Sequence, residues 1–322
     1  MRPAPGPATA PRPEPELPEE GTTHRVLLSG ATGFLGGHLL PRLVARGHRV
    51  RALARPGGRP PGADGPTVEW RVADLVDRAS LAGLAEGCTA AVHLAIRTRA
   101  GRPGDLERAH GAATRHLLAE AARAGVRRFV YVGALGASPA GGPFLRSKFA
   151  AEDAVMTSGR EFVVLRPCII YGPGDRFTSA IVRLLRTLPA FPVPGDGTAA
   201  LQPLAVEDAA DALVQAVERA DLAGRGFDLA GPERLSLVRI VRIIGRTIGR
   251  PRPVVPLPAA SAPLVSGLGR VLRLPEPFAP REREILASGS VLPGTENALR
   301  DVFRLKPLPF ADAVADYLAE AG

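Results

Sequence analysis

Short apolar runs alternate with amphipathic stretches from residue 24 onward, and this alternation predicts the fold. Runs rich in Val, Leu and Ala indicate strands buried on both faces, because such strands need no polar side. They lie at residues 26–28, 49–55, 68–72, 90–95, 128–132 and 227–231, and from Phe162 onward. Helical patterns separate them. The sequence therefore predicts a doubly wound parallel α/β sheet with helices on both faces.

The first predicted strand ends in the glycine-rich stretch Ser29-Gly30-Ala31-Thr32-Gly33-Phe34-Leu35-Gly36-Gly37, and a helical pattern follows from His38 to Arg46. Gly30 allows a sharp turn, Gly33 leaves room for a pyrophosphate, and Gly36 allows close packing of helix and strand. The free N–H groups of the helix start would face the phosphates. This context favours a Rossmann dinucleotide site over an ordinary turn. Its predicted residues are Gly30, Thr32, Gly33, Phe34, Leu35 and Gly36.

The end of the second strand bears on the choice of cofactor. An NAD enzyme places an acidic residue about 20 residues after the glycines, where it accepts a hydrogen bond from the ribose 2′-OH. Here that position holds Ala54, and Arg55 follows. Because a guanidinium can pair with a 2′-phosphate, the sequence predicts that NADP(H) is preferred over NAD(H). The simpler alternative is a surface arginine without a ligand.

The net charge of +9 has an unusual origin. Of the 41 lysine and arginine residues, only Lys148 and Lys306 are lysine. The arginines are spread along the chain, which favours a solvated surface and argues against a nucleic-acid footprint. Lys148 becomes informative, because arginine serves almost everywhere else and only lysine offers an amine that titrates readily.

The two cysteines, Cys88 and Cys168, lie in apolar stretches without metal-ligand spacing. We therefore expect buried free thiols, no metal site and a reducing compartment, the cytoplasm. No stretch approaches the roughly 20 uninterrupted apolar residues of a membrane-spanning helix. Residues 1–23 are rich in proline and lack an apolar signal region, so they are predicted to be a disordered tail.

The most specific pattern surrounds Lys148. The stretch Phe144-Leu145-Arg146-Ser147-Lys148 opens a helix after Gly133-Ala134-Leu135-Gly136-Ala137, and Arg166-Pro167 precedes Tyr171-Gly172-Pro173-Gly174-Asp175-Arg176-Phe177. With the glycine motif, these stretches resemble the extended and atypical short-chain dehydrogenases/reductases, the NAD-dependent epimerase/dehydratase superfamily. Over residues 24–322 the sequence most resembles the group that includes the 39 kDa accessory subunit of respiratory complex I. That subunit binds NADPH without known turnover.

The resemblance implies a catalytic site that is degenerate here. Active members carry Tyr-x-x-x-Lys, in which the lysine holds the nicotinamide ribose and lowers the tyrosine pKa while the tyrosine passes a proton. A serine or threonine and an asparagine complete the set. This sequence retains Lys148 but has Phe144 for the tyrosine, Gly133-Ala134 for the serine, and His110 for the asparagine. The available substitutes are Ser138, Tyr131 and His110. Each also has a structural interpretation: loop serine, strand core and helix surface, respectively.

The resemblance also implies cofactor contacts along the strand ends. Asp74 and Leu75 would lie beside the adenine, although Asp74 could instead cap the helix before Ser80-Leu81. The backbone of Leu94 and Ala95 would line the cofactor, and that of Pro167 and Ile170 would pass the nicotinamide. His93 alternates with apolar neighbours and is expected to be a core histidine.

The resulting domain prediction is a dinucleotide-binding domain at 24–172, to which 201–231 return. Residues 173–200 and 232–322 are assigned to a smaller split α/β cap domain over the substrate. In the cap, Ser236 is predicted to begin a helix with an apolar stripe and a solvated arginine stripe. The segment Pro256–Phe278 is rich in Leu, Val and Pro. It is either core, a cap over the substrate pocket or a patch that makes peripheral contact with a membrane.

These observations favour an NADP(H)-binding protein with a degenerate Ser/Tyr/Lys site, either accessory or regulatory, or weakly active. The alternative is an NADPH-dependent reductase or epimerase in which Lys148 is the general base. A nucleotide-free scaffold would require a vestigial glycine turn, and the intact spacing argues against it. The expected partners are the dinucleotide and an unidentified small molecule or protein, with no nucleic acid.

Overall fold

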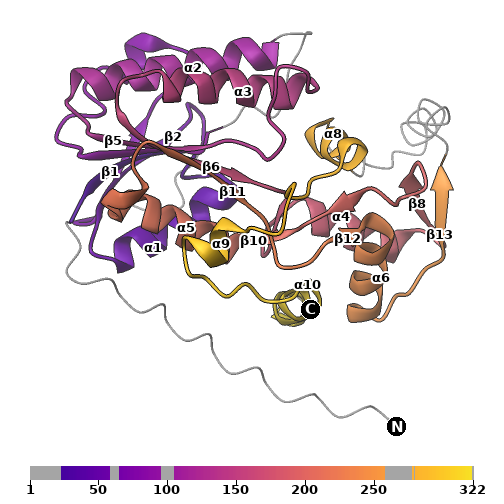
Figure 1. The fold of residues 1–322 in the computed structure, drawn as a ribbon. Coiled ribbons are helices and arrows are strands. Elements are labelled where there is room, and N and C mark those ends of the chain that lie inside the picture. The colour runs from indigo at the N-terminus through magenta and orange to yellow at the C-terminus, as the bar shows by residue number, and fades with distance from the viewer. Residues whose placement is uncertain (1–22, 59–64, 96–104, 258–277, 279, 321–322) are drawn as a thin grey trace.

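The computed structural model describes residues 23–58, 65–95, 105–257, 278 and 280–320. Its centre is a seven-stranded parallel sheet in the order β11-β6-β5-β4-β1-β2-β3 (Figure 1). This confirms the predicted doubly wound α/β fold. The strands are β1 (Arg25–Ser29), β2 (Arg49–Ala54), β3 (Val68–Val72), β4 (Ala90–His93), β5 (Arg128–Val132), β6 (Glu161–Pro167) and β11 (Arg225–Leu229).

Helices cover both faces of this sheet (Figure 1). On one face lie α1 (Phe34–Ala45) and α5 (Val206–Glu218), and on the other lie α2 (Asp105–Arg123) and α3 (Pro143–Met156). Strand alternation divides the core between the faces. Leu28 packs in the cluster that includes Leu39 of α1, whereas Leu27 packs in the cluster that includes Val155 of α3. Short 3-10 turns, η1 (Arg78–Leu81) and η2 (Ala220–Leu222), complete the connections.

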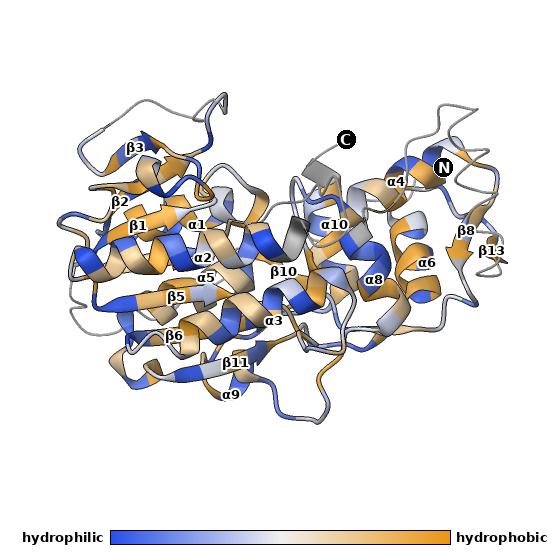
Figure 2. Ribbon diagram, turned by 90° about the horizontal axis from the view of Figure 1, so that it is seen from above, coloured by the Kyte–Doolittle hydropathy of each residue, from blue (hydrophilic) through white to orange (hydrophobic). Residues whose placement is uncertain are grey.

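A smaller group of elements lies beside the carboxyl ends of the strands, and Figure 2 shows it next to the sheet as seen from above. Its strand pairs are β7 with β10, β9 with β12, and β8 with β13. The group has its own cluster of buried apolar residues, to which Phe191, Ile240 and Phe310 contribute. Its elements are β7 (Ile170–Tyr171), α4 (Phe177–Thr187), β8 (Phe191–Pro194), β9 (Ala200–Leu201), β10 (Leu204–Ala205), β12 (Leu235–Ser236), α6 (Leu237–Thr247), β13 (Val254–Leu257), α8 (Pro280–Ser288) and α10 (Phe310–Glu320).

The predicted cap of α6 is confirmed, because the Ser236 hydroxyl accepts a hydrogen bond from the Arg239 N–H at 3.2 Å. The helix buries its apolar stripe. Its arginines Arg239, Arg242 and Arg246 are exposed, as expected for a solvated face.

The chain between Leu292 and Leu305, which the sequence assigns to the smaller domain, packs against the large sheet instead. It contains α9 (Ala298–Asp301). Leu299 and Phe303 belong to the sheet's hydrophobic cluster. The Phe303 ring packs edge-on against the ring of Phe227 in β11, with 5.4 Å between the ring centres. This return covers the edge strand β11.

Two predictions fall largely outside the described residues. The proline-rich tail precedes Thr23, and residues 258–277 include most of the segment for which core, pocket-cap and membrane interpretations remained open. Phe278, at the end of that segment, is buried and contacts Phe177 at a ring distance of 5.9 Å. Among the helices of the described chain, none is both long enough and apolar enough to cross a bilayer.

Candidate functional site

The glycine turn after β1 is as tight as its sequence suggests. Gly30 has φ +80°, and a Cβ on it would lie 2.8 Å from the backbone nitrogen of Ala95. A Cβ on Gly36 would overlap the carbonyl oxygen of Gly30 and lie 2.8 Å from the Cα of Ala31. Only glycine allows α1 to start this close to β1.

The amino end of α1 is open. The helix starts at Phe34, earlier than the predicted His38, because Gly33 serves as its N-cap with φ −86°. Within the described chain no side chain caps this end, and its first turn contains no acidic residue. Thr32 and Gly33 are exposed. The N–H groups of Phe34, Leu35 and Gly36 are therefore available to an anionic ligand such as a pyrophosphate.

Two neighbouring glycines offer a matched test of this packing. Gly36→Ala is expected to lower the free energy of unfolding by roughly 3 kcal/mol and to abolish dinucleotide binding, because the backbone atoms it meets cannot move aside. Gly37→Ala is the control, since a Cβ there meets nothing within 4 Å. In a helix that change should stabilise by up to about 1 kcal/mol. Chemical denaturation checks both values, and equal effects would contradict the packing argument.

Because the sheet is parallel, the carboxyl ends of all its strands lie along the same side of the sheet, which is called its carboxyl edge here. Arg55 follows β2 at this edge and is exposed, whereas Ala54 is buried. After β3, Asp74 does not cap a helix, so that alternative is wrong. The cap of η1 is Asp77, which accepts from the Ala79 N–H at 3.0 Å. The Asp74 carboxylate accepts from the nearby Val76 N–H at 3.0 Å, and Leu75 beside it is partly buried.

The end of β4 lies against the glycine turn. The Leu94 N–H donates to the Ser29 carbonyl at 3.1 Å, and Leu94 and Ala95 are partly buried. His93 is a core residue, as expected. Its ring contacts the hydroxyls of Ser29 at 2.7 Å and Thr114 at 3.1 Å. Burial, with the positive charge of Lys148 adding to it, lowers the pKa of His93 to about 3, so the ring is neutral.

Lys148 lies buried where β5 meets α3. Its Nζ donates to the Val132 carbonyl at 2.8 Å and stands 5.2 Å from the centre of the Tyr131 ring. Burial lowers the pKa of Lys148 to about 7, and the positive charge of Arg281 adds to the effect while Glu152 opposes it. The amine can therefore exist in either protonation state near neutral pH.

Phe144 lies one turn before Lys148 and is buried. Its apolar neighbours include Ala134, Leu145 and Ile285 of α8. The first turn of α3 is capped by a distant residue, because the Glu284 carboxylate accepts from the N–H groups of Phe144 at 3.1 Å and Leu145 at 3.0 Å. Glu284 was not predicted from the sequence. It has no motif of its own, and it lies about 140 residues further along the chain.

The possible substitutes for the catalytic tyrosine are placed differently. Tyr131 lies in β5 and is buried in the core, as expected. Burial raises the pKa of its hydroxyl above the ordinary value for tyrosine. Ser138 is a partly buried loop residue. The helix-surface interpretation of His110 is wrong, because the residue is only 6% exposed. Its Nδ1 lies 2.9 Å from the Ser147 hydroxyl, which donates to the Phe144 carbonyl at 2.6 Å.

Gly133 is the first residue of the pair Gly133-Ala134, which stands where active members have the serine. It faces a carboxylate. A Cβ there would lie 3.0 Å from Oε2 of Glu152, a buried oxygen without a hydrogen-bond partner in the described chain. The other oxygen of Glu152 accepts from Arg166 at 2.6 and 2.8 Å, and Arg166 also donates to Asp228 at 3.2 Å. Two carboxylates thus share one guanidinium.

The remaining predicted residues lie after β6. Pro167 is buried, and its carbonyl accepts from the Leu135 N–H at 3.0 Å. Ile170 is partly buried and pairs with Leu204 in β10. Cys88 and Cys168 are buried free thiols, as expected. Within the described residues, no group of three His, Cys, Asp or Glu side chains could hold a metal ion.

Comparisons with known proteins agree with this arrangement. The chain is 37% identical over 190 residues to a ceramide reductase of Caulobacter vibrioides, which covers 59% of each chain. It is 31% identical to sterol demethylase protein B of Methylococcus capsulatus, over 72% of this chain and 77% of that one. It is also 30% identical to the mitochondrial NADH dehydrogenase (ubiquinone) 1 alpha subcomplex subunit 9 of Arabidopsis thaliana, over 72% of this chain and 60% of that one. The first and third matches span less than two thirds of the relative.

Solved structures share the fold. The crystal structure of gox2253 matches with a TM-score of 0.72 and 26% identity, covering 92% of this chain and 97% of that one. The Bordetella bronchiseptica enzyme WbmH, solved in complex with NAD+, matches with a TM-score of 0.69 and 20% identity, covering 92% and 98%. The model of the NAD dependent epimerase/dehydratase family matches residues 26–230. The chain therefore belongs to the NAD-dependent epimerase/dehydratase family.

Proposed function

We propose that this protein holds NADP(H) as an accessory or regulatory member of its family, with at most weak turnover. The observation that carries the proposal is the buried Phe144 beside the retained Lys148. The ring lies among Ala134, Leu145 and Ile285, so the position that passes a proton in active members offers none. Lys148 remains at the carbonyl of Val132, where its ammonium form could hold a ribose hydroxyl.

The residues present fit a dinucleotide. The uncapped start of α1 offers N–H groups, and Gly30 and Gly36 leave no room for a Cβ in the turn. We assign the pyrophosphate to Gly30, Thr32, Gly33, Phe34, Leu35 and Gly36. We assign the adenine to Asp74 and Leu75, and the nicotinamide end to Leu94, Ala95, Lys148, Pro167 and Ile170. When bound, NADP(H) would supply or accept a hydride.

The preference for NADP(H) rests on Arg55. Arg55→Ala should remove about 1.5 to 3 kcal/mol of NADPH binding and leave NADH binding nearly unchanged, because a charge-assisted hydrogen bond to the 2′-phosphate is lost. Arg49→Ala is the control, since Arg49 is exposed at the opposite end of the same strand. Isothermal titration calorimetry with both dinucleotides tests this, and equal wild-type affinities would refute the preference.

One observation favours a second candidate, an NADPH-dependent reductase or epimerase with Lys148 as the general base. A lysine whose burial brings its pKa to about 7 can accept a proton at neutral pH. The ceramide reductase match supports this candidate, whereas the match to the respiratory subunit supports the accessory function.

We place the chain in the cytoplasm on the support of its two buried free thiols.

A further inference from the structure

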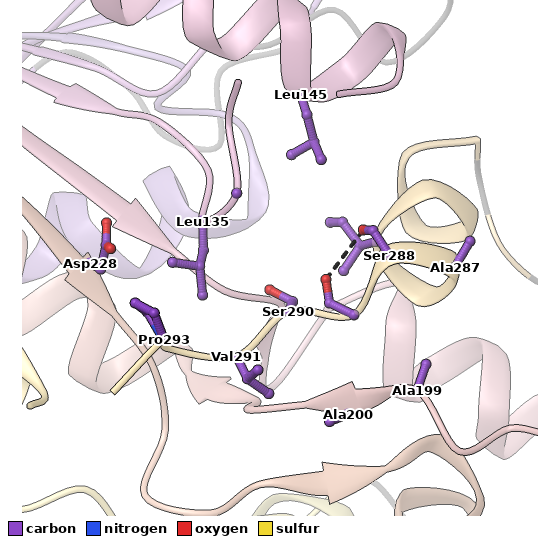
Figure 3. A pocket seen from close by; sticks show the side chains of 13 residues that line it. Leu135, Leu145, Ala199, Ala200, Asp228, Ala287, Ser288, Ser290, Val291 and Pro293 are labelled. Carbon is purple, nitrogen blue, oxygen red and sulfur yellow. Dashed lines mark hydrogen bonds between the residues drawn. The ribbon is translucent and has the colours of Figure 1, made fainter. Parts of the chain in front are cut away.

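A cavity of about 630 Å³ opens between the carboxyl end of the large sheet and α8 (Figure 3). Its walls come from parts of the chain that are far apart in sequence: the loop after β5, the first turn of α3, β9, and α8 with the segment after it. The volume is within the range of small-molecule pockets. Leu145 and Ile285 in its wall pack with Phe144, so the cavity adjoins the degenerate catalytic position.

The lining is aliphatic. Leu135, Leu145, Ile285, Val291 and Pro293 contribute side chains, together with several alanines. In Figure 3 the Leu135 and Leu145 side chains approach this space from the loop after β5 and from α3. Among the described lining residues there is no lysine, arginine, histidine or aromatic ring. A diphosphate would find no cationic side chain to pair with, and a nucleobase would find no ring to stack on.

Among the lining residues that the structure describes, Asp228 is the one ionisable residue. Asp228 shares the guanidinium of Arg166 with Glu152. Guanidinium nitrogens of Arg166 lie 3.2 Å from an Asp228 oxygen and 2.6 Å from a Glu152 oxygen. One guanidinium therefore faces two carboxylates, and Lys148 also interacts electrostatically with Glu152. Within the lining itself, the Asp228 carboxylate disfavours an anionic ligand and tolerates a neutral one.

The Ser290 hydroxyl is a polar group that a ligand could reach. Ser290 is 6% exposed, its N–H donates to the Ala200 carbonyl at 2.9 Å, and its carbonyl accepts from Gln202. Its hydroxyl makes no hydrogen bond in the described part of the chain, and Figure 3 shows it near the centre of the lining. The Ser288 hydroxyl differs, because it already donates to the Glu284 carbonyl at 3.0 Å.

We propose that this cavity binds a neutral, largely aliphatic molecule with one hydroxyl or carbonyl group, which Ser290 recognises. A nucleotide sugar, with its two phosphates and its base, does not match the described lining. This proposal adds a ligand class to the proposed function. It rests on that function only in treating the cavity as part of the dinucleotide site. An aliphatic ligand gains from the burial of its chain, and the single hydrogen bond fixes its polar end.

The test uses 1-decanol as the neutral probe and UDP-glucose as the anionic one, each titrated into the full chain by calorimetry. Wild type should bind 1-decanol saturably and should not bind UDP-glucose. Ala287→Phe should weaken 1-decanol binding at least tenfold, because Ala287 lines the cavity from an exposed helix position that tolerates a ring. Ser290→Ala should weaken it about fivefold, the value of one hydrogen bond.

Ala119→Phe is the matched control, since Ala119 is an exposed helical alanine outside the lining. It should bind 1-decanol like wild type. NADPH titrations of the same samples separate the two proposals, because a protein that binds 1-decanol but not NADPH refutes only the proposed function. Absent 1-decanol binding, binding unaffected by Ala287→Phe, or UDP-glucose binding that Ala287→Phe removes would each overturn the inference.

Discussion

Replacing Lys148 with methionine is expected to stabilise the free protein and to weaken NADPH binding by roughly 10- to 100-fold. The free-energy gain arises because Lys148 is buried with a pKa of about 7, far below the ordinary value near 10.4. Between these values the unfolded chain binds more protons than the folded one, so this residue's contribution to stability rises with pH from about 7 to 10. Below pH 7 the folded state bears the full cost of a buried ammonium.

Denaturant titrations at pH 6 and at pH 9, values chosen on either side of the folded-state pKa, check the stability effect. Between these two pH values the free energy of unfolding of the wild type should rise by on the order of a few kcal/mol because of Lys148. Lys148→Met should lack that rise. Lys306→Met is the control, because Lys306 is the other lysine and is exposed. An identical pH dependence in wild type and Lys148→Met would contradict the buried, depressed amine.

The loss of affinity has a separate signature. If the ammonium holds the ribose, NADPH binding at about pH 8 should draw a proton onto Lys148, since only the charged form makes the contact. Calorimetry in buffers of different ionisation enthalpy should detect proton uptake in wild type and none in Lys148→Met. Binding without proton uptake would favour the alternative in which the neutral amine acts as a base.

Phe144→Tyr alone is expected to leave NADPH-dependent carbonyl reduction within about tenfold of wild type. Positioned acid–base groups contribute roughly 10²- to 10⁴-fold in rate, but they do so only when the substrate oxygen is oriented. At this site Ala134 offers no hydroxyl, and Ile285 packs against the position from α8. The side chains of these apolar neighbours would offer a new phenol no hydrogen-bond partner.

The matched control is Phe149→Tyr, because Phe149 lies on the same helix and is exposed. Initial rates of NADPH oxidation with aldehydes and ketones provide the measurement. A rise of 10²-fold or more in Phe144→Tyr would show that one hydroxyl completes the site, and the degenerate site would then be a single-residue change.

The features that sequence could predict are those that local patterns encode. The apolar runs located the sheet strands, and Ser236 located the start of α6, because strand alternation and helix capping are short-range effects. The glycine turn was predictable for the same reason. Its φ of +80° at Gly30 follows from residues within a few positions.

What the sequence could not predict depends on contacts between distant segments. Glu284 caps α3 from α8, and Phe303 returns to cover β11. The burial of His110 depends on the packing of α2 against α3, through its contact with Ser147. Asp77 replaces Asp74 as a cap because the turn geometry, and not the residue type, selects between two similar aspartates.

We propose that NADP(H) is held here by a site that no longer transfers a hydride efficiently. The most direct test measures NADPH oxidation by wild type and Lys148→Met against a panel of aldehydes, ketones and quinones, with NADPH binding confirmed in the same wild-type samples. We predict saturable NADPH binding by wild type and no turnover beyond that of the variant. Robust wild-type turnover that disappears in Lys148→Met would contradict the claim.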